Sequence, residues 1–432
     1  MSTNLKFYGW RLLGVIFALE FINMGFPYYG ATVINSYMIH QIPMNRSTLG
    51  LGFTLVNLAV GLSAPLVAMH IEKFGIRKTY VVGSGMIFVG SLFLGIFASR
   101  PWHYLVAFGI VTGLGISAAT MVPSAIVATR WFRRYRGRAI GIALSGAGIS
   151  GFGVAWLLDK ILRSANGNWR VGWYIVAAAA VVSGIIAAIF VKESPESMGQ
   201  YVDGIPPIEQ ATSARVQTLS TNRLWTASQA YRTWAFWLIA IVGILNTYST
   251  FFFTAHTVLY MRGAGIASDK AAFTMGIFTI SLLVGRWIGG LTMDFIDARV
   301  SYAIALALII IGSYFYALVN HSTAIIPAYL AAALYGVSHG WVFSCVATMT
   351  GNYYGRDVFP KLYGTMMLFI SAGASPAGYL GGKLFEVYGS YMPAIILNAA
   401  LSVVGIIAIL FAKMPTTIAP IDPALQPVDQ PA

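Results

Sequence analysis

Twelve apolar runs, separated by polar, glycine- or proline-containing segments, follow one another along this 432-residue chain. A helix needs roughly 20 apolar residues to cross the hydrocarbon core of a bilayer, and the runs are of about that length. Only 9% of the residues are charged, whereas a soluble domain has about 25%, so an ordinary soluble protein is excluded. We therefore predict an all-α membrane protein with twelve transmembrane helices, at about 10–36, 47–70, 79–98, 102–128, 138–162, 169–191, 233–260, 269–294, 300–319, 323–349, 360–386 and 390–412.

One long polar connection, which contains several prolines, divides the predicted helices into two groups of six. We expect an N-terminal six-helix bundle at 1–191, a linker at 192–232 and a C-terminal six-helix bundle at 233–413. The remaining tail, 414–432, is rich in proline and alanine, a composition typical of disordered segments.

Lysine and arginine are distributed unevenly between the two sides of the predicted helices. The larger share of the 27 basic residues falls in the terminal segments and in the loops on the same side. Because cytoplasmic loops carry an excess of these residues, we predict that both termini are cytoplasmic. The expected location is the inner (plasma) membrane, as a multi-pass monomer. The net charge of +13 lies in short loops, so we expect a lipid bilayer and no nucleic acid as partner.

The sequence carries no recognisable catalytic or metal-binding signature. It has no CxxC pair, no HExxH and no phosphate loop ending in Gly-Lys-Ser/Thr. The one cysteine, Cys345, excludes an intrachain disulfide and a site that binds metal through several cysteines. We therefore expect no enzymatic activity, no cofactor and no metal.

Arg286 is a fixed positive charge inside the apolar run 269–294. Its guanidinium keeps its proton at any ordinary pH, and placing it near the middle of a membrane costs about 2.5–3.5 kcal/mol on insertion scales. Its planar fork can hold a carboxylate through two parallel hydrogen bonds, which a low dielectric strengthens. We therefore predict that Arg286 binds an anionic substrate; the alternative is a structural arginine paired between helices.

Two corresponding helix ends carry the same kind of charge pattern. The second run ends with Glu72 followed by Arg77, and the eighth ends with Asp294 followed by Arg299. A carboxylate at such a helix end can engage neighbouring helix N-termini and arginines in one conformation. We predict that these four residues act as a gate on the inner face; the alternative is two ordinary polar helix ends.

The chain resembles the major facilitator superfamily over nearly its whole length, and most of all its branch of monocarboxylate transporters and oxalate/formate antiporters. The loop after the second run departs from the usual pattern, with Ala68 for glycine and Glu72 for aspartate. The resemblance implies the major facilitator fold, two six-helix bundles around a central cavity, alternating access and small carboxylates as cargo. It is carried by the segments 7–10 (FYGW), 130–141 (RWFRRYRGRAIG), 285–286 (GR) and 371–381 (SAGASPAGYLG).

The resemblance also bears on the number of charges that the cargo carries. In the resembled family an arginine at the position of Arg286 binds the substrate carboxylate, and the oxalate antiporters use a second cation in the eleventh helix. Counted from Tyr363-Gly364, that second position is Ile370 in this chain. A second anionic group would be desolvated without a partner. We therefore predict a small monocarboxylate, similar to lactate or pyruvate, carried by proton-coupled symport.

Two other functions remain open. The nearer alternative is an organic anion antiporter of the oxalate/formate type. A transporter-derived carboxylate sensor is more remote, because such sensors usually carry a soluble signalling domain and this chain has no segment long enough for one.

Glu20, in the first run, is the acidic residue that lies deepest in a predicted helix. Burial favours the protonated form of a carboxyl, so we predict that Glu20 couples protons to transport; the alternative is an internally bonded glutamic acid. The family's more familiar acid, one turn before the arginine, is absent, because Leu282 stands there. His256, near the outer end of the seventh run, is a second candidate for proton coupling.

Six further residues are candidates for lining the substrate site. The resemblance places Tyr28 at a cavity tyrosine of the antiporter branch and His339 at an aromatic cavity position. Residues near the middle of the seventh, tenth and eleventh runs could add donors or apolar walls; these are Asn246, Tyr248, Phe343 and Phe369. Packing against other helices or lipid is the alternative for each.

Overall fold

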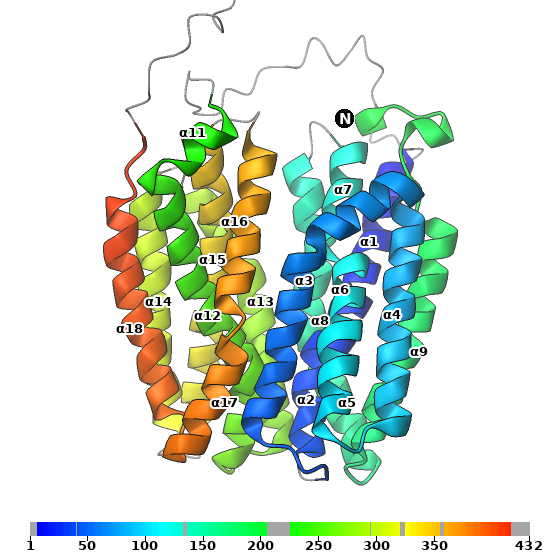
Figure 1. Cartoon of the computed structure of the whole chain (residues 1–432), viewed down its shortest axis with the longest axis vertical. Coiled ribbons are helices and arrows are strands. Elements are labelled where there is room, and N and C mark those ends of the chain that lie inside the picture. Colours follow the sequence, from blue (N-terminus) through cyan, green and yellow to red (C-terminus); the bar gives the residue numbers. More distant parts are fainter. Residues whose placement is uncertain are drawn as a thin grey trace, which may run out of the picture.

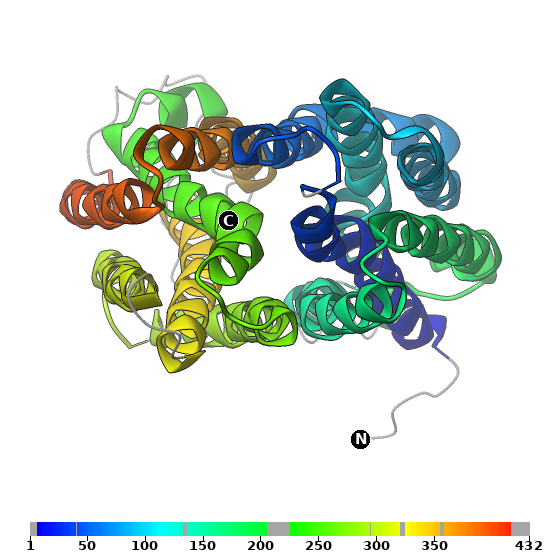
Figure 2. The ribbon, with the colours of Figure 1, turned by 90° about the horizontal axis from the view of Figure 1, so that it is seen from below.

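The computed structural model describes residues 7–39, 41–132, 136–204, 225–293, 295–319, 325–354 and 358–415. Within this described part the chain forms helices and turns and no β-strand. Two helical bundles stand side by side, and each contributes one half of the molecule when it is seen along the helix axes (Figures 1 and 2). The predicted fold class, an all-α protein of two helical bundles, is confirmed.

The N-terminal bundle contains the first six spans, and the first and the fourth are built from consecutive helical segments. Its elements are α1 (Tyr8–Met24), η1 (Gly25–Tyr29), α2 (Gly30–Met38), α3 (Arg46–Phe74), α4 (Ile76–Phe97), α5 (Pro101–Tyr104), η2 (Leu105–Thr112), α6 (Gly113–Ala119), α7 (Met121–Trp131), α8 (Arg136–Ser164) and α9 (Trp169–Phe190). Two short 3-10 turns follow, η3 (Glu196–Met198) and η4 (Val202–Gly204).

The C-terminal bundle begins with a short helix that lies outside the membrane-spanning part. Its elements are α11 (Ala227–Tyr231), α12 (Trp234–Gly263), α13 (Ser268–Thr292), α14 (Ala298–Leu318), α15 (Ile325–Tyr354), α16 (Phe359–Ala374), α17 (Ala377–Tyr388) and α18 (Met392–Phe411). The middle of the predicted linker, 205–224, and the tail from 416 lie outside the described residues.

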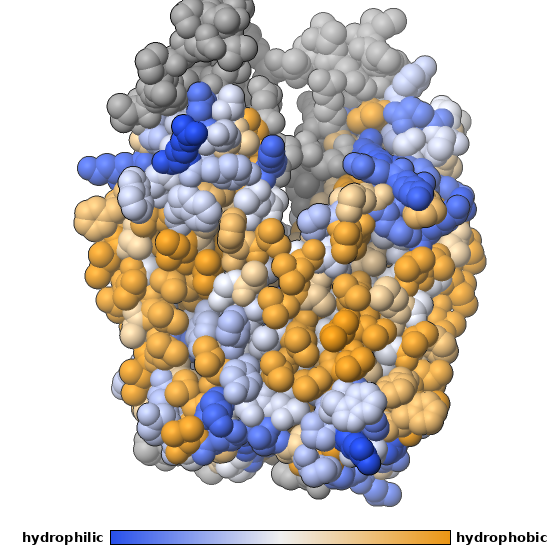
Figure 3. All heavy atoms as spheres, viewed as in Figure 1, coloured by the Kyte–Doolittle hydropathy of each residue, from blue (hydrophilic) through white to orange (hydrophobic). Residues whose placement is uncertain are grey.

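Eleven spans in the described part are long and apolar enough to cross a bilayer, and a broad apolar belt crosses both bundles on the face seen in Figure 3. The remaining predicted helix, 360–386, is broken into α16 and α17 at Ser375-Pro376. Proline has no N–H and clashes with the preceding turn, so it interrupts a helix. The eleventh predicted span, 360–386, therefore consists of two shorter helices that together run the height of the bundle (Figure 1).

Thr54 of α3, in the other bundle, occupies this break. Its hydroxyl donates to the carbonyl oxygen of Ser375 at 2.7 Å and accepts from the N–H of Tyr379 at 3.2 Å. In an unbroken helix these two backbone groups would bond to each other, four residues apart. A side chain inserted into this ladder is a recognised cause of helix bending. The broken helix and the contact between the bundles therefore depend on each other.

The bundles are bonded together at the end of the molecule opposite the linker, which we call the closed end. At the start of α3, Arg46 donates to the Tyr391 hydroxyl at 3.2 Å, and the N–H of Ser47 donates to the Glu386 carboxylate at 3.0 Å. From there the two bundles diverge toward the end that carries the linker (Figure 1). We call that end the linker end.

A buried carboxylate forms a second junction at the closed end. Asp159 of α8 accepts hydrogen bonds from Tyr37 of the same bundle, at 2.8 Å, and from Ser268 of the other. Arg163 pairs with Asp159 at 2.8 Å and reaches Asp269, in the other bundle, at 3.8 Å. These charge-assisted contacts join α2 and α8 to the beginning of α13.

Candidate functional site

Arg286 lies on α13 between the closed end and the linker end. Its side chain is half-buried, and its guanidinium carbon lies 4.9 Å from the centre of the Phe343 ring on α15. Its Nε is buried without a hydrogen-bond partner. Within the described residues no carboxylate forms an ion pair with it. A cation held in this way is available to an anionic ligand.

The position of Arg286 follows from close packing of α13 on α15. A Cβ at Gly340 would lie 1.9 Å from the Leu282 carbonyl oxygen and 2.8 Å from the backbone nitrogen of Arg286. Only glycine therefore permits this approach of the two backbones. The Ser344 hydroxyl also donates to the Arg286 carbonyl oxygen at 3.0 Å, which ties the same turn of α13 to α15.

Two tyrosines that the sequence analysis missed lie within electrostatic reach of the guanidinium. Tyr29 comes from the N-terminal bundle and Tyr363 from α16 in the C-terminal bundle. Tyr29 interacts in the same way with Glu20. Tyrosines from both bundles therefore lie within electrostatic reach of one cation.

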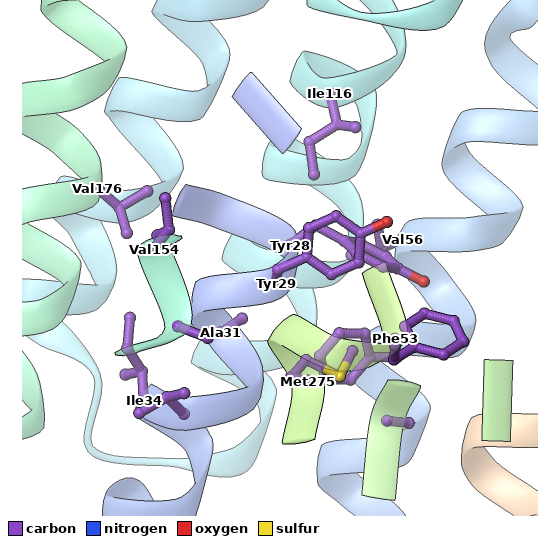
Figure 4. Packing of buried hydrophobic residues seen from close by; sticks show 14 of the residues in the cluster. Tyr28, Tyr29, Ala31, Ile34, Phe53, Val56, Ile116, Val154, Val176 and Met275 are labelled. Atoms are coloured by element: carbon purple, nitrogen blue, oxygen red, sulfur yellow. The ribbon is translucent and has the colours of Figure 1, made fainter. Parts of the chain in front are cut away.

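A π-helical segment, η1, sets the orientation of the tyrosines in the first span. A π-turn adds one residue to a helical turn, and such bulges occur frequently at functional sites. Tyr28 and Tyr29 pack at 5.5 Å between ring centres, and Tyr28 packs on Phe53 at the same distance (Figure 4). The Tyr28 hydroxyl donates to Asn57 at 3.1 Å. Tyr28 is therefore already bonded within its own bundle.

His339 forms a bonded pair with Asn246 and lies within electrostatic reach of Arg286. His339 Nδ1 is 3.1 Å from the Asn246 side-chain oxygen, and Arg286 acts on the ring electrostatically. His339 and Phe343 are four residues apart on α15 and share one face of the helix. The structure thus brings two of the predicted site residues, His339 and Phe343, near Arg286, and a third, Asn246, is bonded to His339.

Two other predicted residues are placed differently. Tyr248 is 8% exposed and belongs to the buried part of α12. Phe369 is 41% exposed and packs on Trp237, at 5.2 Å between ring centres. At 100° per residue it lies on a different face of α16 from Tyr363, which is the residue near Arg286. The structure does not bring Phe369 to the guanidinium.

Glu20 is buried in the N-terminal bundle and is 2% exposed. Its carboxylate accepts a hydrogen bond from the Ser124 hydroxyl at 2.5 Å, and Ser124 in turn lies 2.7 Å from the Tyr80 hydroxyl. Arg286 interacts with it electrostatically across the space between the bundles. This arrangement can hold a proton within the field of the Arg286 guanidinium.

His256 lies in the closed end. Its Nε2 is 2.7 Å from the Gly378 carbonyl oxygen, and its Nδ1 is 3.1 Å from the Tyr391 hydroxyl. The imidazole is therefore part of the junction that also contains Arg46. It is bonded on both sides there, not grouped with His339 and Phe343 around Arg286.

Three of the predicted gate residues lie at the linker end, where the bundles are apart. Glu72 and Arg77 are exposed, and Asp294 lies outside the described residues. Arg299 pairs with Asp297 at 2.8 Å, and this hydrogen-bonded contact lowers the pKa of the Asp297 carboxyl. The gate between the bundles therefore stays a prediction, and it applies to a conformation in which the linker end is closed.

Glu193, which the sequence analysis did not single out, has a structural role at the same end. Its carboxylate accepts from the backbone N–H of Ile76 at 2.7 Å and of Arg77 at 3.1 Å. It therefore caps the N-terminus of α4, where a negative charge is favourable. The contact fixes the beginning of the linker to the N-terminal bundle.

Three comparisons place the chain among known proteins. It is 25% identical to monocarboxylate transporter 13 of Bos taurus over 351 residues, 79% of this chain and 75% of that protein. It is 23% identical to the riboflavin transporter MCH5 of Saccharomyces cerevisiae over 358 residues, 79% of this chain and 65% of that protein. The crystal structure of a mutant of the nucleoside transporter NupG superimposes with a TM-score of 0.72 at 13% identity, covering 93% of this chain and 99% of that one.

These similarities agree with the geometry described above, and the structural match concerns the fold alone. The sequence profile of the Major Facilitator Superfamily matches residues 12–378, which is most of the chain. The chain therefore belongs to the Major Facilitator Superfamily.

Proposed function

We propose that the protein is a secondary transporter of a small monocarboxylate, coupled to protons, in the plasma membrane. The observation that carries the proposal is Arg286, a half-buried guanidinium without an ion-pair partner among the described residues. A charge at this depth is unfavourable unless a ligand neutralises it. The similarity to monocarboxylate transporters supports the same class of cargo.

Alternating access explains how such a site would work. The bundles are bonded at the closed end and diverge toward the linker end, so the anion would reach Arg286 from the linker side in this conformation. The excess of basic residues supports the linker side as cytoplasmic. A closed linker end and an open opposite end would then expose the same site to the other side.

The proposal is tested by uptake of labelled monocarboxylates into proteoliposomes. With a pH gradient, acidic outside, we expect accumulation above the external concentration, because proton entry drives anion entry. Uptake that ignores the gradient and requires an internal anion would replace symport with exchange, as in the oxalate/formate antiporters. The absence of both uptake and exchange for every acid would refute the carboxylate assignment.

Glu20→Gln is expected to uncouple anion transport from proton transport. The glutamine oxygen can still accept from Ser124, so the local structure is kept, but the side chain can no longer bind and release a proton. We expect accumulation driven by pH to be lost and exchange of labelled for unlabelled substrate to be retained. Both are measured in the same proteoliposomes.

The matched control is Glu196→Gln, which makes the same change in an exposed turn outside the bundles. It should accumulate substrate as the unmodified protein does. If Glu20→Gln accumulates substrate as well as this control, Glu20 is not the coupling site.

A further inference from the structure

The hydrogen-bond network behind His339 determines which ring nitrogen carries a hydrogen. Ser338 donates its single hydroxyl hydrogen to the Ala305 carbonyl oxygen at 2.6 Å, because a carbonyl can only accept. Its oxygen is then free only to accept from Asn246 Nδ2, at 3.3 Å. The amide of Asn246 is thereby oriented with its oxygen toward His339.

This orientation of the Asn246 amide determines the tautomer of His339. An amide oxygen is an acceptor, so Nδ1 of His339, 3.1 Å away, must be the donor. A second positive charge beside the Arg286 guanidinium is unfavourable at low dielectric, so the ring is neutral. The hydrogen is therefore on Nδ1, and Nε2 presents a lone pair that can accept a hydrogen bond but cannot donate one.

The acceptor belongs to a ring that lies within electrostatic reach of the cation. His339 is half-buried, and it is one helical turn from Phe343, whose ring contacts the guanidinium at 4.9 Å. The phenols of Tyr29 and Tyr363 near Arg286 can either donate or accept, so they do not distinguish between ligands. The imidazole does distinguish between ligands, because its Nε2 can only accept a hydrogen bond and therefore requires a donor.

We propose that His339 makes the site selective for 2-hydroxy monocarboxylates over their 2-oxo counterparts. The inference rests on the proposed function and extends it. With the carboxylate on Arg286, a hydroxyl on the adjacent carbon donates to His339 Nε2. A 2-oxo acid carries a carbonyl oxygen instead, and two lone pairs then face each other without a hydrogen between them. A site built to bond one polar group rejects an analogue that lacks its hydrogen.

The test compares L-lactate with pyruvate, and glycolate with glyoxylate, as competitors of labelled substrate in proteoliposomes. We expect the unmodified protein to bind each hydroxy acid about tenfold more tightly than its oxo partner, since a buried acceptor is otherwise left unpaired. His339→Phe keeps an aromatic wall and removes the acceptor. The ratio should then approach one, mainly through weaker binding of the hydroxy acids.

A second variant tests the network and not the ring. In Asn246→Leu the imidazole is released from its fixed tautomer, so Nε2 can carry the hydrogen, and the ratio should shift toward the oxo acids. His103→Phe, at a partly exposed histidine of α5, is the matched control and should leave the ratio unchanged.

Each ratio is taken within one protein, so differences in expression or stability cancel. The inference is overturned if the unmodified protein binds hydroxy and oxo acids equally well, or if the tenfold preference is still present in His339→Phe. Neither result contradicts the proposed transport of monocarboxylates. If none of the four acids competes, the carboxylate assignment fails and the selectivity fails with it.

Discussion

Arg286→Lys is expected to lower the transport of a monocarboxylate, measured as kcat/KM in proteoliposomes, by about 100-fold. Losing one member of a buried, hydrogen-bonded charge pair costs about 2–5 kcal/mol, and each 1.4 kcal/mol is about tenfold. Lysine keeps the charge, but its ammonium is a point donor that cannot form two parallel hydrogen bonds to one carboxylate. The guanidinium also stacks on Phe343 at 4.9 Å, a contact that depends on its planar shape.

The matched control is Arg100→Lys, the same change at an exposed position before α5. It should transport normally. If Arg286→Lys keeps an affinity close to that of the control, the guanidinium does not hold the substrate and the proposed site is elsewhere. A variant that keeps its thermal stability and loses transport fits the proposal.

The architecture could be predicted from the sequence because the bilayer imposes it. A span must be apolar over roughly 20 residues, and a run of that length is visible in the sequence. The break at Ser375-Pro376 was missed although Pro376 is a plain signal. The broken helix is stabilised by Thr54, which is more than 300 residues away in the chain, as the bonds to Ser375 and Tyr379 show.

The site was predicted less completely, for a physical reason. Arg286 is recognisable alone because a charge in hydrocarbon is unusual whatever surrounds it. Tyr29 and Tyr363 approach it from two different bundles, and a tyrosine in a membrane helix is common. Phe369 was predicted from its place near the middle of the eleventh run, but residues at similar depth can lie on different faces of a helix, because consecutive residues point about 100° apart. Which residues of the two bundles lie close together depends on the tertiary structure, and residue spacing along one helix does not reveal it.

Gly50→Leu is expected to block net transport almost completely, because it prevents the two bundles from coming together at the closed end. A Cβ at Gly50 would lie 1.9 Å from the carbonyl oxygen of Gly378 and 2.5 Å from its carbonyl carbon, in the opposite bundle. These are backbone atoms, so they cannot turn aside as a flexible side chain would. The conformation in which the linker end is open then becomes inaccessible, and alternating access stops.

The separation of the two bundles at the closed end can be measured directly. Spin labels at Gln41 and Lys383, exposed at the closed end in the two bundles, should lie farther apart in Gly50→Leu than in the unmodified background. Gly85→Leu, where a Cβ has no neighbour within 4 Å, is the matched control and should keep both the distance and transport. Binding of substrate by Gly50→Leu, with transport lost, distinguishes a locked transporter from an unfolded one. Normal transport with an unchanged label distance would mean that the bundles do not close through this glycine contact.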